Sequence, residues 1–340
     1  MLKIESVAAE ADDLGPALDE TGRPRRPMVV VDADSDRSQL DRAVANLRGA
    51  GSIVVAVTRT STPLAPLVEI ADVSLARAPV APDDGVTVAV PDPLAALARL
   101  QTQVDANPRA ALTLAWMLRE GGEFSVDHGL AAESAAYSML LAGSEFRRWL
   151  DQRGPARPID GGERVQVSRS GDTLSIVLNR PGRRNAVDAG MRDALREALS
   201  LAEWDTALLV EVSGAGPSFS SGGDLDEFGT ADDPPTAHLV RVTASVGAAL
   251  HRLRDRTTVR VHGVCMGAGV ELPAFAGRVV AAPGTTFALP EIGMGLIPGA
   301  GGTVSVPRRI GAPRALWLAL AGVPLDAPTA LAWGLVDAIG

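Results

Sequence analysis

The amino-acid sequence predicts an α/β protein whose sheets are largely parallel and covered by helices. The segment 27–58 runs from a buried strand through an amphipathic helix into a second buried strand, a pattern typical of parallel sheets. From residue 165 onward, a strand–strand–helix unit recurs along the chain. Apolar residues make up 46% of the 340 residues, which is enough for one large or two medium domains with real cores.

The first part of the chain is predicted to hold a flexible arm followed by a small β-α-β unit. Residues 1–26 are polar and carry Pro and Gly, which favours an arm. Residues 27–86 then contain strands at 27–34 and 52–58 around a helix at 36–51. The order of strands and helices in 29–79 repeats in 208–283, and we interpret the first as a shortened, degenerate copy of the second. Chance resemblance between two α/β segments is the alternative.

A helical subdomain is predicted for residues 87–154, followed by a linker at 155–164. Helical periodicity runs through 90–107, 108–120 and 127–154. Asp92 followed by Pro93 is a typical helix start, because the aspartate can cap and proline suits the first helical position. The linker "PARPIDGGER" is polar and rich in Pro and Gly.

Residues 165–340 are predicted to form the functional core. A hairpin is expected at 165–181, with its turn at Ser170-Gly171-Asp172. A helix capped by Asp188 should cover 188–204. The remaining expected elements are a strand at 207–214, a helix at 243–255, a strand passing through glycines into a helix at 257–277, and two short strands at 278–291.

The composition excludes several classes of function. A net charge of −9 and only 4% aromatic residues argue against a nucleic-acid partner. No segment has the length and apolarity of a membrane span or the pattern of a secretion signal. The single cysteine, Cys265, fits a reducing compartment, so we expect a cytoplasmic protein with Cys265 as a small buried residue. The four histidines show no metal-ligand spacing, and no metal site is expected.

Two glutamates stand alone in apolar stretches. Glu291, in "LPEIGMGLIPGAGG", is the only charged residue from Val279 to Pro307. Glu271, in "GVELPAF", has no charged neighbour between His262 and Arg278. Each could be an exposed loop residue. If instead they are buried together, loss of hydration would raise their pKa values toward neutrality and suit them to paired acid/base work.

Glycine-rich stretches follow two of the predicted strands. "GAGPSFSSGGD" (214–224) and "GVCMGAGVE" (263–271) lack the features of phosphate or dinucleotide loops. Such glycines commonly serve tight turns. Both stretches nevertheless lie at strand-to-helix junctions, where backbone N–H groups are left unpaired, and two of these donors aimed at one point would form an oxyanion hole.

The second half resembles the crotonase, or enoyl-CoA hydratase/isomerase, superfamily. The resemblance covers about residues 165–340 and is carried by "LNRPGRRNAV", "SFSSGGDLDEF", "VHGVCMGAGVELPAFAGRVVAAPGTTFALPEIGMGLIPGAGGTVSVPRRIG" and "ALAWGLVDAI", in that order. It implies a spiral of strand–strand–helix turns acting on acyl-CoA thioesters in fatty acid metabolism. The coenzyme A enters as part of the substrate, with no separate cofactor.

The resemblance also implies roles for individual residues. The N–H groups of Ser221 and Ala268 would hold the thioester oxygen, although Ala268 stands where the family usually has glycine. Glu271 and Glu291 would activate water and protonate the α-carbon. Two glutamates twenty residues apart favour a hydratase, a lyase, over an isomerase or another crotonase-type hydrolase or lyase. The positions implied for coenzyme A or substrate contact are Arg183, Arg184, Ala186, Ser220, Gly222, Gly223, Asp224, Leu225, Gly267, Pro298, Gly299 and Trp149.

One departure from the family pattern is large. Family members continue beyond "GLVDAI" with helices that cover the site and build trimers, whereas a similar helical segment here, 87–153, precedes the core. Circular permutation or fusion to a degenerate first copy would both produce this order. The resemblance implies a homo-oligomer, a trimer or hexamer, with substrate choice set by loops such as 229–241. A non-catalytic assembly subunit that keeps the fold is the alternative from another class.

Overall fold

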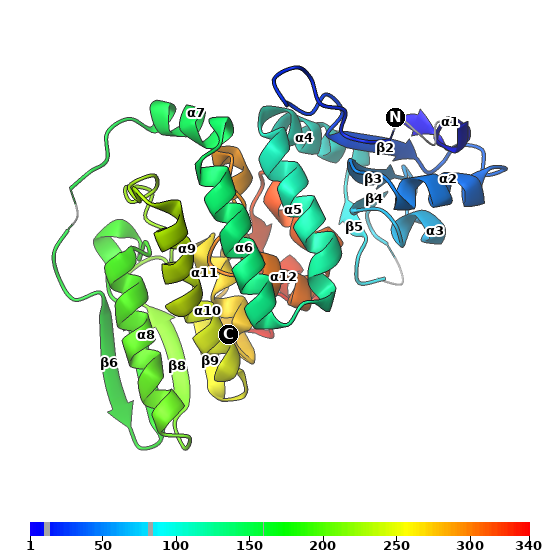
Figure 1. The fold of residues 1–340 in the computed structure, drawn as a ribbon. Coiled ribbons are helices and arrows are strands. Elements are labelled where there is room, and N and C mark those ends of the chain that lie inside the picture. The colour runs from blue at the N-terminus through cyan, green and yellow to red at the C-terminus, as the bar shows by residue number, and fades with distance from the viewer. Residues whose placement is uncertain (10–13, 81–83, 159) are drawn as a thin grey trace.

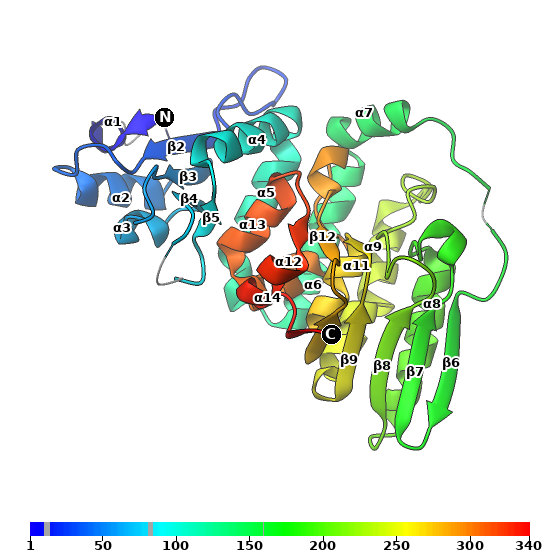
Figure 2. The same ribbon diagram turned by 180° about the vertical axis from the view of Figure 1, so that it is seen from behind.

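The computed structural model describes residues 1–9, 14–80, 84–158 and 160–340, and these residues form three sheets together with the surrounding helices (Figure 1). A parallel N-terminal sheet, a group of helices from residues 93–153 and a larger C-terminal sheet follow one another across the molecule, and Figure 2 shows the same succession from behind. The predicted α/β class is confirmed. No helix in these described ranges is long and apolar enough to cross a bilayer.

The N-terminal sheet is parallel throughout, and its strands lie in chain order. The strands expected at 27–34 and 52–58 are confirmed, but the helix expected from residue 36 begins only at Leu40. The Asp36 carboxylate accepts the N–H of Ser38 at 3.1 Å, and this local bond competes with helix formation. The elements are β1 (Leu2–Lys3), α1 (Ile4–Ala9), β2 (Met28–Asp32), α2 (Leu40–Arg48), β3 (Ile53–Val57), α3 (Ala65–Val68), β4 (Val73–Arg77) and β5 (Val88–Val90).

The expectation that residues 1–26 form a flexible arm is wrong for its first part. Strand β1 pairs in parallel with β2, and Ile4 and Val7 of α1 are fully buried. Asn46 of α2 donates to the carbonyl of Val7 at 3.0 Å. Two apolar residues in a short polar segment give no periodic signal, and they become core residues only because α2 and β2 supply a surface for them.

The helical segment confirms the predicted start at Asp92, whose carboxylate accepts the N–H groups of Leu94 and Ala95 at 2.9 and 3.1 Å. The single helical stretch expected at 127–154 is two helices, because the chain turns at Gly143. This turn lets the buried carboxylate of Glu145 accept the N–H groups of Arg109 and Ala110. The elements are α4 (Pro93–Ala106), α5 (Pro108–Glu120), η1 (Gly121–Glu123), α6 (Val126–Leu141) and α7 (Ser144–Arg153).

The C-terminal core contains a six-stranded sheet in the order β14-β11-β9-β8-β7-β6, parallel except for the β6–β7 hairpin. A smaller sheet joins β10, β12 and β13. The predicted hairpin and the Asp188 cap are confirmed. The strands are β6 (Val165–Ser170), β7 (Thr173–Leu178), β8 (Leu209–Gly214), β9 (Thr257–Val261), β10 (Val264–Met266), β11 (Arg278–Ala281), β12 (Thr286–Ala288), β13 (Leu325–Asp326) and β14 (Ala338–Ile339).

The helices of the core, together with α6, surround the candidate site. The expectation of a loop at 229–241 is wrong for most of that segment, which contains a helix, α9, whose first turn is capped by Asp233. Helix α6 of the N-terminal half packs against α9, α10 and α12 of the core. The core helices are η2 (Pro181–Arg183), α8 (Ala189–Trp204), α9 (Pro234–Thr243), α10 (Val246–Arg252), η3 (Arg254–Arg256), α11 (Ala268–Glu271), η4 (Pro273–Phe275), η5 (Glu291–Met294), α12 (Gly302–Ile310), α13 (Ala312–Leu320) and α14 (Ala327–Trp333).

Candidate active site

The two glycine-rich stretches lie side by side. Ser220 and Cys265 form a parallel β-bridge, and the N–H of Met266 donates to the carbonyl of Ser220 at 3.0 Å. A Cβ at Gly269 would lie 2.5 Å from that same carbonyl oxygen, so only glycine permits this approach. The strand ends of β8 and β9 therefore deliver both stretches to one place.

The backbone donors left open there differ from the expected pair. The N–H of Ser221 donates to the carbonyl of Arg184 at 2.9 Å and is not available to a ligand, which corrects the expectation for Ser221. Within the described part of the chain, the N–H groups of Gly223 and Ala268 have no acceptor, and both residues line one cavity. Ala268 begins α11, where the first N–H groups of a helix are unpaired. The open donors are therefore Gly223 and Ala268.

Glu271 ends α11 and is buried, with 2% of its surface exposed. Its Oε2 accepts the N–H groups of Ala300 and Gly302 at 2.7 and 2.8 Å, just before and at the start of α12. Burial raises the pKa of Glu271 to about 7, against the opposing effect of these two hydrogen bonds. The carboxylate is thus held in one orientation and can titrate near neutral pH.

Glu291 begins η5 and is 7% exposed. Its Oε2 is buried without a hydrogen-bond partner among the described residues. Burial, and secondly the negative charge of Glu271, raises the pKa of Glu291 well above its ordinary value. Gly267, at φ +48°, faces the other oxygen: a Cβ there would lie 2.4 Å from Oε1. The glycine is needed for the close packing of backbone on carboxylate.

The two glutamates share a cavity of about 230 Å³ with the open donors. A second cavity, of about 180 Å³, shares five lining residues with the first, among them Glu227 and Arg241. Tyr137 and Leu141 of α6 also line the first cavity, so the N-terminal half contributes to the site. Glu271 and Glu291, which the sequence singles out because no other charged residue lies near either of them, therefore meet in one cavity of the folded protein.

A third buried carboxylate, Glu133 of α6, was missed from sequence. Its Oε1 accepts the N–H of Gly301, and its Oε2 accepts the N–H and hydroxyl of Thr303, all at 2.7–2.8 Å. Burial, and secondly the charge of Glu271, raises the pKa of Glu133 to about 8. Glu133 is also the only charged residue between His128 and Glu145, so the pattern that singled out Glu291 could have found it.

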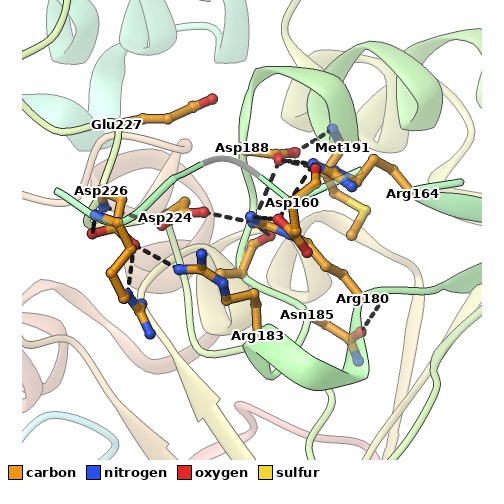
Figure 3. Close-up of polar contacts among 12 residues, drawn as sticks. Asp160, Arg164, Arg180, Arg183, Asn185, Asp188, Met191, Asp224, Asp226 and Glu227 are labelled. Atoms are coloured by element: carbon orange, nitrogen blue, oxygen red, sulfur yellow. Dashed lines mark hydrogen bonds and ion pairs between the residues drawn. The ribbon is translucent and has the colours of Figure 1, made fainter. Parts of the chain in front are cut away.

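Figure 3 shows how the loops expected to hold coenzyme A are tied together. The buried guanidinium of Arg180 contacts Asp160, the carbonyl of Ala186 and, at 2.6 Å, Asp224. The hydrogen bond from Arg180 lowers the pKa of Asp160 to about 2. Asp224 is therefore held by Arg180 while it also lines the cavity of the two glutamates, and its contact with coenzyme A stays a prediction.

The two arginines of "PGRRN" are not equivalent. Arg183 pairs with Asp226 at 2.7 Å and donates to the carbonyl of Pro158, so its guanidinium is already engaged, contrary to expectation. Arg184 is exposed in the left-handed region, with φ +52°. Of the two, Arg184 is the one whose charge is open to an anion.

The remaining expected positions are distributed around the cavity. Gly299 lines it, Gly222 packs against the carbonyl of Met266, and Ser220 and Pro298 are buried. Leu225 is 42% exposed. Trp149 stacks on Phe146 and lies 6.1 Å from Phe228, and it reaches the cavity only through Phe228. Cys265 is buried, as expected, and burial raises the pKa of its thiol to about 12.

Comparison with known proteins places this site in a family. The model of the family described as "Enoyl-CoA hydratase/isomerase" matches residues 173–339. YhaR from Bacillus subtilis (strain 168), described only provisionally as an enoyl-CoA hydratase/isomerase, is 34% identical over 176 residues, which cover 52% of this chain and 69% of YhaR. The 2,3-dehydroadipyl-CoA hydratase of Escherichia coli (strain K12) is 35% identical over 172 residues, covering 50% of this chain and 67% of that enzyme.

A crystal structure of enoyl-CoA hydratase from Thermoplasma volcanium GSS1 aligns with a TM-score of 0.47 at 31% identity, covering 53% of this chain and 72% of that one. Fold and site define an α/β protein with two buried carboxylates beside a pair of open backbone donors. The sequence relatives specify the class further: the chain belongs to the enoyl-CoA hydratase/isomerase family, the crotonase superfamily.

Proposed function

We propose that this protein stabilises a thioester enolate and adds water across the double bond of a 2-enoyl-CoA. One observation carries the proposal: Glu271 and Glu291 are buried without a cationic partner in the same cavity as the unpaired N–H groups of Gly223 and Ala268. Backbone donors of this kind stabilise negative charge that develops on a thioester oxygen. The name of one curated relative, a 2,3-dehydroadipyl-CoA hydratase, supports the choice of reaction, while that of YhaR covers both hydratase and isomerase.

The environments of the two glutamates favour different roles. The two backbone N–H groups that donate to Glu271 stabilise its ionised form. Glu271 is therefore the base that takes a proton from water. Glu291 has an unpartnered oxygen and a strongly raised pKa, so it is the protonated acid. Hydroxide adds to C3, the electron pair moves through C2 to the thioester oxygen, and the enolate then takes the proton of Glu291 at C2.

Coenzyme A belongs to the substrate in this scheme, and the exposed guanidinium of Arg184 would meet its phosphates. We further propose a homo-oligomer, a trimer or hexamer, which light scattering on the purified protein would test. A cytoplasmic location is proposed with it, because a free thiol such as that of Cys265 is stable there.

The test is to incubate the protein with crotonyl-CoA and follow loss of the conjugated thioester and formation of 3-hydroxybutyryl-CoA. Hydration supports the proposal. Conversion of a 3-enoyl-CoA to its 2-enoyl isomer, with no hydration and no need for Glu271, would instead assign an isomerase. Binding of the CoA ester without turnover would assign a non-catalytic assembly subunit.

A further inference from the structure

Arg241, on α9, stands out among the residues around the candidate active site. It lines both the cavity of Glu271 and Glu291 and the adjoining cavity. Burial lowers the pKa of its guanidinium, which remains charged at neutral pH. A charge that has lost hydration needs compensation from nearby polar groups.

The hydrogen-bond and ring partners of Arg241 are all neutral, and the charge of Glu133 acts on it without a hydrogen bond or ion pair between them among the described residues. Its Nε donates to the hydroxyl of Ser134 at 3.0 Å, and its Nη2 contacts the Ser138 hydroxyl and the Ser134 carbonyl. Its guanidinium lies 5.1 Å from the centre of the Tyr137 ring. Over the described ranges of the chain, Arg241 forms no ion pair and its Nη1 has no acceptor.

Other charged side chains near these cavities are already engaged. Glu227 lines both cavities, but both of its carboxylate oxygens accept the N–H of Ala189, at 2.9 and 3.2 Å. Arg192, which lines the second cavity, pairs with the exposed Asp193 at 2.8 Å. Of these two arginines, Arg241 is the one that lines both cavities, and among the described residues it forms no ion pair and its Nη1 has no acceptor.

We infer that Arg241 binds a carboxylate at the far end of the acyl chain, so that the substrates are acyl-CoA esters of dicarboxylic acids. This inference rests on the proposed acyl-CoA function and specifies its substrate class. The Gly223 and Ala268 donors line the same cavity as Arg241, and Arg241 also belongs to the lining that this cavity shares with the second one. A guanidinium with a free Nη1 suits a carboxylate through charge-assisted hydrogen bonds.

The same donors could instead meet a phosphate of coenzyme A, or tie α9 to α6 with no ligand. These three roles of Arg241 differ in which CoA esters would bind more weakly once its guanidinium is removed. A contact to the acyl carboxylate matters only for a dicarboxylic ester. A phosphate contact or a structural tie affects every CoA ester alike.

The test uses titration calorimetry with two unreactive saturated esters of equal chain length, glutaryl-CoA and pentanoyl-CoA. In the unmodified protein, glutaryl-CoA should bind about tenfold more tightly. In Arg241→Gln, glutaryl-CoA should bind about 30-fold more weakly, while pentanoyl-CoA changes less than about threefold. Arg241→Lys should lose part of the preference, because lysine keeps the charge without the planar fork.

Arg252→Gln is the matched control, because it removes the same charge from an arginine that pairs with Glu203 at 2.7 Å away from both cavities. It should leave both dissociation constants unchanged. Equal weakening of the two esters in Arg241→Gln, or no glutaryl preference in the unmodified protein, overturns the inference while leaving the acyl-CoA function standing. If neither ester binds the unmodified protein, both the inference about Arg241 and the proposed acyl-CoA function are overturned.

Discussion

The N-terminal sheet and the C-terminal core treat their charged residues in opposite ways. In the N-terminal sheet, Asp32 ends β2 and Asp34 follows it, and both pair with Arg59 after β3, at 3.1 and 3.0 Å. Thr58 also donates to Asp34 at 2.5 Å. In the core, Glu271 and Glu291 are buried with no basic partner among the described residues, and one oxygen of Glu291 has no hydrogen bond.

This difference distinguishes charged residues that stabilise the fold through ion pairs from buried, unpaired carboxylates that are available for a reaction. At the ends of β2 and β3, both aspartates are paired with Arg59, and Asp34 also accepts the hydroxyl of Thr58. Unpaired buried carboxylates cost stability, and proteins keep them where a reaction uses their raised pKa. Each prediction below compares a core residue with a paired or unconstrained counterpart.

The largest effect is expected for Glu291→Gln. Loss of the acid should lower kcat/KM for crotonyl-CoA about 1,000-fold. Stability should change little, because the protonated carboxyl of Glu291 is already neutral and the amide has nearly the same shape. Asp34→Asn is the paired counterpart: it should leave activity intact and lower the free energy of unfolding by about 1 kcal/mol in urea titrations. A Glu291→Gln enzyme within a few-fold of full activity would refute the acid role.

Gly267→Ala should follow, with a loss of about 100-fold in kcat. The added Cβ would lie 2.4 Å from Oε1 of Glu291 and would displace that carboxylate from its working position. The φ of +48° adds backbone strain of about 1–2 kcal/mol. In Gly293→Ala, the new Cβ meets nothing within 4 Å, so activity and melting temperature should hold. Equal losses in both variants would show that the effect is not specific to Glu291.

Glu133→Gln and Glu145→Gln make a closer comparison, because each buried carboxylate accepts two backbone N–H groups near the start of a helix. Both changes should lower the free energy of unfolding by about 1–3 kcal/mol. Only Glu133→Gln should also reduce kcat, about tenfold. Glu133 accepts the N–H groups of residues 301 and 303, which alternate along the chain with residues 300 and 302, the donors to Glu271, so a shift at Glu133 would also move Glu271. A similar fall in kcat for Glu145→Gln would contradict a positioning role for Glu133.

The smallest expected effect is a pH dependence of stability with opposite signs for the buried glutamates of the site and for Asp34 of the N-terminal sheet. The folded-state pKa values of Glu271 and Glu133, about 7 and about 8, lie above the unfolded value of 4.5. The folded protein therefore binds more protons, and these groups stabilise it less as pH rises through 7 and 8. The melting temperature should fall by on the order of 5 °C from pH 6 to pH 9, and by less in Glu271→Gln.

Asp34 of the N-terminal sheet should show the opposite pH dependence of stability. Although burial opposes it, hydrogen bonds from Thr58 and Arg59 lower the pKa of Asp34 below its ordinary value of 3.8. That contribution is present above the unfolded pKa and is lost as pH falls through the folded one. Asp34→Asn should change stability near neutral pH and leave the loss between pH 6 and pH 9 as it is. If Asp34→Asn removed that alkaline loss, the assignment to the core carboxylates would be wrong.

Much of the core could be predicted because its signals are local. Period-two strands, the caps at Asp92 and Asp188, and two carboxylates in apolar runs are all visible within a few residues. Helix α9 escaped prediction, and with it Arg241, whose Ser134 and Ser138 partners lie more than 100 residues away. The burial of Ile4 and Val7 likewise depends on β2 and α2, which come later in the chain.

The sequence by itself determined which residue types are available: isolated glutamates, glycines at strand ends and the order of the motifs. Only the tertiary structure decided which backbone donors remain open. Ser221 and Gly223 are two positions apart, yet the carbonyl of Arg184 takes the N–H of Ser221, and no carbonyl takes that of Gly223 among the described residues. Hydrogen bonds of a few tenths of a nanometre require partners that the chain brings together only when folded, so no local pattern could have chosen between them.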